Sequence, residues 1–248
     1  MINIYTEKEI EVMREGGKIL AKILKQVAKK VKPGITTEYL NKVANDLILK
    51  YKAKSSFKGF NNYPAVLCAS INEEIVHAVP SDRILKKGDI LSLDLGIRYK
   101  GYCTDAAITV SVGKIDKKEK KLIAVTKKAL EIGIKQAKLG NHLEDIGWVI
   151  QGYVEKQGFN VIRDLVGHGV GKNVHEDPQI LNYGEKGTGP ELVEGMVLAL
   201  EPMVSMGNWE IEKCEDSFGY RTKDRSLTAH FEHTIAITKK GPKILTKI

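Results

Sequence analysis

Long apolar runs, paired cysteines and an N-terminal targeting segment are all missing from this sequence. Nowhere in its 248 residues does an apolar run approach the roughly 18 residues that a membrane span requires. The first residues lack the basic start and apolar stretch of a secretory signal. The three cysteines, Cys68, Cys103 and Cys214, cannot all pair with one another, and their spacing matches no zinc site. These absences predict a cytoplasmic protein in a reducing compartment, with no membrane partner.

Several common catalytic motifs are absent as well. The chain contains no Gly-x-Ser-x-Gly elbow and no phosphate-binding loop ending in Gly-Lys-Ser or Gly-Lys-Thr. The glycines of residues 167–171 lack the third glycine and the acidic partner of a dinucleotide site. A cysteine nucleophile at Cys68 or Cys103 stays open, but a small buried thiol is the commoner role. The serine hydrolase and nucleotide-hydrolysing classes are therefore disfavoured.

The charge balance is basic, because 39 Lys and Arg residues against 31 Asp and Glu residues give a formal net charge of +8. Such an excess favours a polyanionic surface such as ribosomal RNA, so a transient ribosome contact is one expectation. The lysines are nevertheless scattered, with no arginine-rich or aromatic-interleaved block, which favours a solvated surface. We also expect the chain to be a monomer.

Helix signals occur in two pairs along the chain. Thr6-Glu7-Lys8-Glu9 is a capping box that opens the first helix, and a second helix starts at about Thr37. Asp116 opens a third helix in the same way as Thr6, and residues 141–144 cap a fourth. Strand-like runs lie between and after the helices, at Ile90–Leu95, Ala106–Val112, Val197–Leu200 and Phe231–Thr238.

A weak internal repeat is the most informative large-scale feature. Residues 32–38 resemble residues 138–144, and Leu91-Ser92-Leu93-Asp94 resembles Leu198-Ala199-Leu200-Glu201. Each half therefore contains two helices, a strand that ends in a carboxylate and a strand that begins with one. We predict a single α+β domain over 1–248, with halves of roughly 1–113 and 114–248, a pseudo-two-fold antiparallel sheet and paired helices covering one face.

Four carboxylates come from matched positions of the two halves and stand in or beside apolar runs. A carboxylate in such a run is costly to bury unless a positive charge meets it, so we expect a shared cation site. His168, between glycines, is the expected nitrogen ligand, which suits manganese, iron, cobalt or zinc better than calcium. Any single carboxylate would be better explained as a strand end or an ion pair. As a set they predict two divalent metal ions held by Asp94, Asp105, His168, Glu201 and Glu232.

The other histidines are ambiguous on sequence alone. His77 and His175 stand beside apolar residues, where histidine is more often a hydrogen-bonded structural group than a catalyst. The metal cluster makes a functional role for both more plausible. His142 falls in a helix cap, while His230 and His233 flank Glu232, and all three are assigned structural roles.

These residues resemble the type I methionine aminopeptidases over essentially the whole chain, from about Glu7 onward. Ligands, flanking residues, order and spacing all agree with that family. The short segment between His175 and Glu201 leaves no room for the helical insertion of the type II enzymes. The matching stretches are Asn72–Pro80, Ser92–Gly96, Thr104-Asp105, Gly167–Gly171, His175–Pro178, Glu201–Met203, Thr222–Leu227 and Glu232–Thr234.

The resemblance implies the pita-bread (creatinase/aminopeptidase-like) fold and an enzyme that removes the initiator methionine of nascent proteins, preferring a small second residue. Asp94 would bind one metal, Asp105 and Glu232 would bridge both, and His168 and Glu201 would complete the other. Glu201 would also relay a proton from the attacking water. The resemblance further implies that His175 contacts the substrate carbonyl or the tetrahedral intermediate, and that His77 contacts the scissile nitrogen or the following residue.

The family pattern also implies an apolar pocket for the methionine side chain. Phe60 stands where a tyrosine is usual, Val174 where an aromatic residue is frequent, and Phe218 where tryptophan is often found. The pocket stays apolar in spite of these differences, so the preference for methionine should be kept, while its width is left open. The expected lining residues are Phe57, Phe60, Tyr63, Cys68, Val174 and Phe218, together with His77 and His175.

Two other functions remain open at this point. A proline-specific peptidase of the prolidase type has the same fold, but those relatives usually carry an additional N-terminal domain. A non-catalytic relative that binds RNA or another protein is the second alternative. Relatives of that kind have lost metal ligands, whereas all five positions are filled here.

Overall fold

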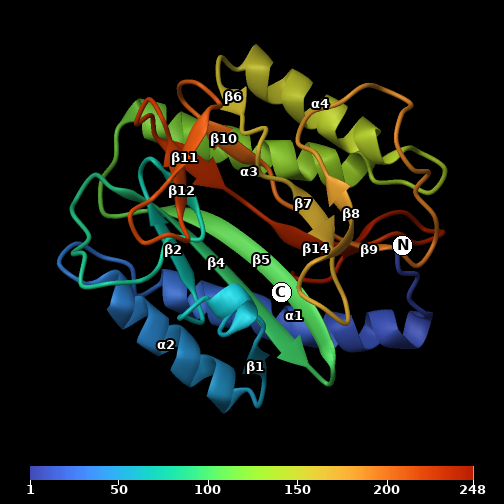
Figure 1. Cartoon of the computed structure of the whole chain (residues 1–248), viewed down its shortest axis with the longest axis horizontal. Coiled ribbons are helices and arrows are strands. Elements are labelled where there is room, and N and C mark those ends of the chain that lie inside the picture. The colour runs from blue at the N-terminus through green and yellow to red at the C-terminus, as the bar shows by residue number, and fades with distance from the viewer. Residues whose placement is uncertain (248) are drawn as a thin grey trace.

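The computed structural model describes residues 1–247, and its four α-helices form two pairs. In Figure 1, α1 and α2 lie together at the lower side of the molecule, α3 and α4 lie at the upper side, and the long strands run between the pairs. None of the helices in the described part of the chain is long and apolar enough to cross a membrane. The helices are α1 (Glu7–Ala28), α2 (Thr37–Lys50), the short 3-10 helix η1 (Phe60–Asn62), α3 (Lys117–Gln136) and α4 (Leu143–Lys156).

Two of the helix starts show the capping chemistry that the sequence predicts. The Thr6 hydroxyl accepts a hydrogen bond from the Glu9 N–H, and the Glu9 carboxylate accepts one from the Thr6 N–H at 2.8 Å. At the start of α4, the Asp145 carboxylate accepts the N–H of His142 at 2.8 Å. The expectation for the third helix was wrong in one respect. Asp116 precedes α3, but its side chain makes no capping hydrogen bond.

Every strand pairing is antiparallel, but the strands form four hydrogen-bonded sheets where one was expected. The larger sheets are β1-β4-β2, with β5 on β4, and β15-β14-β9-β7-β8. Two three-stranded sheets, β13-β10-β6 and β11-β12-β3, complete the β-structure. The strands are β1 (Lys54–Ser55), β2 (Cys68–Ile71), β3 (Glu74–Val76), β4 (Ile90–Tyr99), β5 (Tyr102–Ser111), β6 (Asn160–Val161), β7 (Gly167–Gly169), β8 (Glu176–Ile180), β9 (Val197–Leu200), β10 (Met203–Ser205), β11 (Ile211–Lys213), β12 (Tyr220–Thr222), β13 (Thr228–His230), β14 (His233–Ala236) and β15 (Lys243–Ile244).

The first hairpin is longer than its apolar pattern suggested. Strands β4 and β5 continue to a two-residue turn at Lys100 and Gly101, which both have positive φ, the backbone form that suits a tight hairpin. Asp94 and Asp105 therefore lie inside strands and not at their ends, contrary to expectation. The second half follows the prediction, because Glu201 directly follows β9 and Glu232 directly precedes β14.

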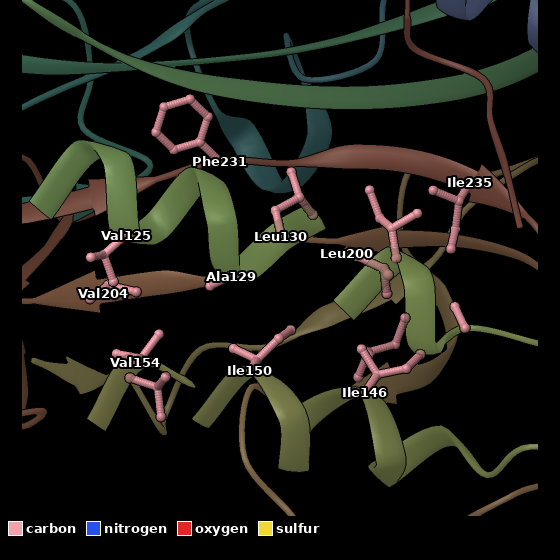
Figure 2. Packing of buried hydrophobic residues seen from close by; sticks show 14 of the residues in the cluster. Val125, Ala129, Leu130, Ile146, Ile150, Val154, Leu200, Val204, Phe231 and Ile235 are labelled. Atoms are coloured by element: carbon pink, nitrogen blue, oxygen red, sulfur yellow. The ribbon is translucent and has the colours of Figure 1, made fainter. Parts of the chain in front are cut away.

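The alternation of side chains along the strands separates the core from the opposite face of each sheet. Leu91, Leu93 and Leu95 of β4 pack into the core formed with α1 and α2. Because successive side chains of a strand point to opposite faces, Asp94 and Gly96 lie on the other face. In the second half, Leu200 packs against α3 and α4 in the same way. Figure 2 shows this core, formed by Val125, Ala129, Leu130, Ile146, Ile150, Val154, Leu200, Val204, Phe231 and Ile235.

The two halves meet through side-chain bonds where β5 lies against β14. The hydroxyl of the buried Thr234 accepts the N–H of Asp105 at 2.9 Å and donates to the Asp105 carbonyl at 2.8 Å. The N–H of Glu232 donates to the carbonyl of Ala107 at 2.9 Å. These bonds replace a continuous ladder between the two larger sheets, which explains why the sheet divides. They also place one carboxylate from each half side by side.

Two glycines in helices should respond in opposite ways to a methyl group. A Cβ added at Gly17 of α1 would lie 2.4 Å from the Leu245 carbonyl oxygen, so Gly17→Ala should cost about 1–3 kcal/mol of unfolding free energy. Gly152 of α4 is exposed and has no described atom within 4 Å of an added Cβ, so Gly152→Ala should stabilise by about 0.5–1 kcal/mol. Urea denaturation of both variants measures the two changes, and shifts of the same sign would contradict the packing described for α1.

Candidate metal centre

The hairpin β4–β5 contributes two carboxylates to one face. Asp105 stands directly opposite Gly96, which is two residues beyond Asp94 on β4, so both carboxylates lie on the face away from α1 and α2. Gly96 leaves room for an aromatic ring, because an added Cβ would lie 2.5 Å from Cε1 of Phe57. Cys68 of β2 is paired with Asp94 and faces the same side.

The five-stranded sheet contributes the remaining three groups. His168 of β7 pairs with Ala199 of β9, and Thr234 of β14 pairs with the same Ala199. Glu201 is two residues beyond Ala199, and Glu232 is two residues before Thr234. By strand alternation, His168, Glu201 and Glu232 project from one side of this sheet.

These side chains converge across the junction of the halves. Asp105, His168 and Glu232 each offer a ligand atom, and the three atoms lie within 4.8 Å of one another. All five groups proposed from the sequence line the same cavity of about 130 Å³. The structure therefore brings together all four carboxylates and the histidine that the repeat indicated.

The chemistry of this cluster fits divalent cations. Asp94, Asp105 and Glu232 are buried, and within residues 1–247 none of them forms an ion pair with a lysine or arginine. Oδ1 of Asp94 and Oε1 of Glu232 also have no hydrogen-bond partner in the described chain. Leaving such oxygens unpaired costs about 1–3 kcal/mol each, and more when they are charged. A cation bound among them would remove that cost.

The proton affinities of the cluster support the same conclusion. Burial raises the pKa of Asp94, Glu201 and Glu232 well above their ordinary values, and the neighbouring carboxylates raise it further. Burial raises the pKa of Asp105 to about 7, although the N–H of Ala106 acts against this. Burial lowers the pKa of His168 to about 3, so its imidazole is neutral and able to bind a metal. Keeping all four carboxylates ionised at neutral pH would therefore require positive charge between them.

Metal-free protein should become less stable as the pH rises from about 4 to about 7. Asp105 has a reference pKa of 3.8 when unfolded and about 7 when folded, so between these values the folded state binds the extra proton. Stability is then present at low pH and lost as pH rises. We expect the thermal midpoint of chelated protein to fall by roughly 5 °C or more across this window. Protein saturated with Mn²⁺ should show no such fall, and a rise in the chelated protein would contradict the assignment.

Aromatic rings form the rest of the cavity wall. The Tyr63 and Phe218 rings meet edge to face with centroids 5.5 Å apart, and Phe60 meets the His175 ring in the same way at 5.0 Å. The Tyr63 hydroxyl lies 3.0 Å from the backbone carbonyl oxygen of Leu67, to which it donates a hydrogen bond. The apolar wall predicted from the sequence is thus present, lined by Phe57, Phe60, Tyr63, Cys68 and Phe218.

One predicted pocket residue is misplaced and one was missed. Val174 is buried but does not line the cavity, because it packs with Phe57 and Tyr63 in the cluster that supports the wall. Asn61 lines the cavity and was not predicted. Its φ of 46° is in the left-handed region, as is that of Asn62 at 64°. The Asn-Asn pair was the available signal, since asparagine tolerates this conformation better than most residues.

His77 and His175 lie where the cavity opens. The rings of His175 and His168 have centroids 4.4 Å apart, and burial lowers the pKa of His77 to about 4 and that of His175 below its ordinary value. His77 also has a φ of 61°, an uncommon backbone form that tends to occur at functional sites. Both imidazoles are therefore neutral at physiological pH, and each can donate one N–H.

A groove of about 510 Å³ adjoins the cavity at this point. The two spaces share His77, His168, His175 and Glu201. Beyond these four, the groove is lined by Asp164, Leu165, Val166, Gly167, Glu176, Asp177, Gln179, Val76 and Met203. The cavity and the groove are thus adjoining spaces that share two of the candidate metal ligands, His168 and Glu201.

Comparison with known proteins assigns this chain to a family. Residues 11–239 match metallopeptidase family M24. The chain therefore belongs to metallopeptidase family M24, whose activity depends on divalent metal ions. Within that family, similarity over the full length places it with the methionine aminopeptidases, so it is an enzyme of the aminopeptidase class.

The similarity is closer to aminopeptidases than to prolidases. The methionine aminopeptidase of Clostridium acetobutylicum is 49% identical over 247 residues, covering 99% of both chains. The crystal structure of a methionine aminopeptidase from Thermotoga maritima matches with a TM-score of 0.98 and 48% identity, covering 100% of both chains. A prolidase from Pyrococcus horikoshii reaches 0.77 and 25%, covering 98% of this chain and 63% of the prolidase. These matches confirm the pita-bread fold and disfavour the proline-specific alternative.

Proposed function

We propose that this enzyme hydrolyses the first peptide bond of nascent proteins that begin with methionine, using two divalent ions held by Asp94, Asp105, His168, Glu201 and Glu232. The observation that carries the proposal is that a cavity lined partly by aromatic rings and an adjoining groove meet at this buried cluster. Manganese, iron, cobalt and zinc all suit the ligand set. Asp94 would hold one ion, Asp105 and Glu232 would hold both, and His168 and Glu201 would complete the second.

Three residues beside the metal site have separate proposed roles in the reaction. Divalent ions held by these residues would supply Lewis-acid chemistry, polarising the scissile carbonyl and lowering the pKa of the attacking water. A Glu201 carboxylate oxygen accepts the proton of that water and returns it to the leaving amine. His175 donates its N–H to the carbonyl oxygen as negative charge develops there. His77 contacts the scissile nitrogen or the residue that follows it.

The shape of the site explains the choice of substrate. A cavity of about 130 Å³ beside the metal ligands would hold the side chain of a single residue, which fits cleavage next to an N-terminal residue. Its aromatic lining suits a methionine side chain, whose sulfur makes favourable contacts with ring edges. The second residue would lie beside His77 and His175, and a small side chain is expected to be preferred there. The rest of the polypeptide would follow the groove.

Release of free methionine from defined peptides tests the proposal. Metal-free protein is reconstituted anaerobically with each of the four ions and given Met-Ala-Ser, Met-Lys-Ser and Xaa-Pro dipeptides. We expect Met-Ala-Ser to be cleaved at least about 100-fold faster than the others, because a misfit at the second residue disturbs the reacting geometry. Equal cleavage of Met-Ala-Ser and Met-Lys-Ser would remove the small-residue preference. Faster Xaa-Pro cleavage would indicate a prolidase, and absence of both metal and turnover a binding protein.

The wider setting of the enzyme is also proposed. Residues 1–248 act as one catalytic domain with two similar halves, and the enzyme works as a cytoplasmic monomer. Transient contact with the ribosome would bring it to its nascent substrates. That contact is supported by the net charge of +8 and by exposed lysines along α3, where a phosphate backbone would find positive charge, at Lys117, Lys118, Lys121, Lys128 and Lys135.

A further inference from the structure

Glu201 has a second histidine neighbour, which the proposed reaction leaves without a role. His230 closes β13 and is 1% exposed, and its Nε2 lies 3.5 Å from Oε2 of Glu201. On the other side of the same carboxylate, Nε2 of His168 lies 3.5 Å from Oε1. The two oxygens of Glu201 are therefore each faced by a different imidazole.

Neither ring nitrogen of His230 has a hydrogen-bond partner elsewhere in the described chain. The ring is nevertheless buried. A neutral imidazole carries one N–H, on either of its two ring nitrogens. An N–H on Nε2 would face the carboxylate oxygen. Buried polar groups of this kind are rare without a partner, and hydrogen bonds at catalytic sites often shorten when the complete site assembles.

The backbone on both sides of the contact is held firmly. The Thr109 hydroxyl accepts the N–H of His230 and donates to its carbonyl, both at 2.8 Å. Ser92 lies 2.8 Å from the same hydroxyl. On the opposite side, the backbone carbonyl of Glu201 accepts a hydrogen bond from Asn182 at 3.1 Å. Small side-chain movements alone can therefore shorten the distance between the imidazole and the carboxylate.

We propose that His230 is a positioning residue, whose Nε2–H donates a hydrogen bond to Oε2 of Glu201 and so keeps Oε1 directed toward His168 and the cavity. The role rests on the proposed function of Glu201 as metal ligand and proton acceptor. A carboxylate held through one oxygen cannot rotate away, so its other oxygen stays available for both tasks. Partners of this kind, one step behind a ligand, typically change metal affinity or activity about 10- to 100-fold when lost.

A matched pair of substitutions separates the hydrogen bond from the packing. Gln and Met are similar in length and flexibility, but only His230→Gln keeps an N–H donor. We expect His230→Met to lower kcat about 10- to 100-fold with KM nearly unchanged, and to weaken Mn²⁺ binding in calorimetry by about 10-fold. His230→Gln should restore both values to within about fivefold of the wild type. Equal kcat values and equal Mn²⁺ affinities in the two variants would overturn the proposal.

His233 offers a control from the same part of the chain. It flanks Glu232 on the other side, and its Nδ1 already lies 2.9 Å from the Thr246 hydroxyl, so it has a partner away from Glu201. His233→Gln should therefore leave kcat and Mn²⁺ affinity within about twofold of the wild type, even where it lowers the thermal midpoint. A loss as large as that of His230→Met would mean that any change beside Glu232 disturbs the site, and would overturn the specific role of His230.

A measurement on the wild-type protein keeps the test independent of folding and turnover. Nitrogen-15 NMR of the Zn²⁺-loaded enzyme reports which ring nitrogen of His230 carries the proton. The proposal requires protonated Nε2 and bare Nδ1, and the opposite tautomer would overturn it. Because this readout needs no substrate, failure of the wild type to release methionine would count against the proposed function and not against the hydrogen bond.

Discussion

Asp105→Asn is expected to abolish turnover, with a loss of about a thousandfold or more in kcat. The ligand atom of Asp105 lies within 4.8 Å of those of both His168 and Glu232, and we expect it to contact both ions. Asparagine has the same shape as aspartate but no charge. The two ions would therefore face one negative charge fewer, and one metal–oxygen contact would be weaker. The rate of methionine release from Met-Ala-Ser, together with bound metal by mass spectrometry, measures the effect.

The substitution should leave the fold intact, which makes the result interpretable. The backbone of Asp105 is held by Thr234, and an asparagine oxygen can still accept the N–H of Ala106. Asp145→Asn at the start of α4 is the control, because Asp145 also has low solvent exposure but serves as a helix cap. That variant should turn over normally. Normal turnover in Asp105→Asn would remove Asp105 from the metal centre.

His175→Ala should lower kcat by about 100- to 1,000-fold and leave bound metal unchanged. The His175 ring lies beside His168 and against Phe60 in the wall of the cavity. Its neutral imidazole can donate to the carbonyl oxygen, where charge develops in the transition state, so its loss affects kcat more than KM.

This experiment decides whether His175 donates a hydrogen bond to the substrate or is itself a metal ligand. His142, at the start of α4, is the control histidine, and His142→Ala should turn over at the wild-type rate within about twofold. Parallel loss of metal and activity in His175→Ala would show that His175 is itself a ligand, and the division of roles between His175 and His168 would have to be changed.

Features of the fold that depend on residues close together in the sequence could be predicted from it. The capping box at Thr6, the start of α2 and the strand Val197–Leu200 depend on short-range hydrogen bonding and on apolar periodicity. The extension of β4 and β5 to the turn at Lys100 was missed, because Arg98 and Tyr102 interrupt the apolar pattern while pairing continues. Asp116 shows the limit of a cap motif, since residue type alone does not place the side-chain oxygen.

By itself, the sequence determined the family, the helix pairs and the identity of the acidic groups, because motif order and side-chain chemistry are properties of the chain. Tertiary structure alone decided how these groups meet. Thr234 hydrogen-bonds Asp105 to β14. Val174 lies behind the cavity wall, whereas Asn61 lines the cavity. His230 lies 3.5 Å from Glu201. Contacts of this kind join residues far apart in the chain, and no local periodicity encodes the distance between two side chains on different sheets.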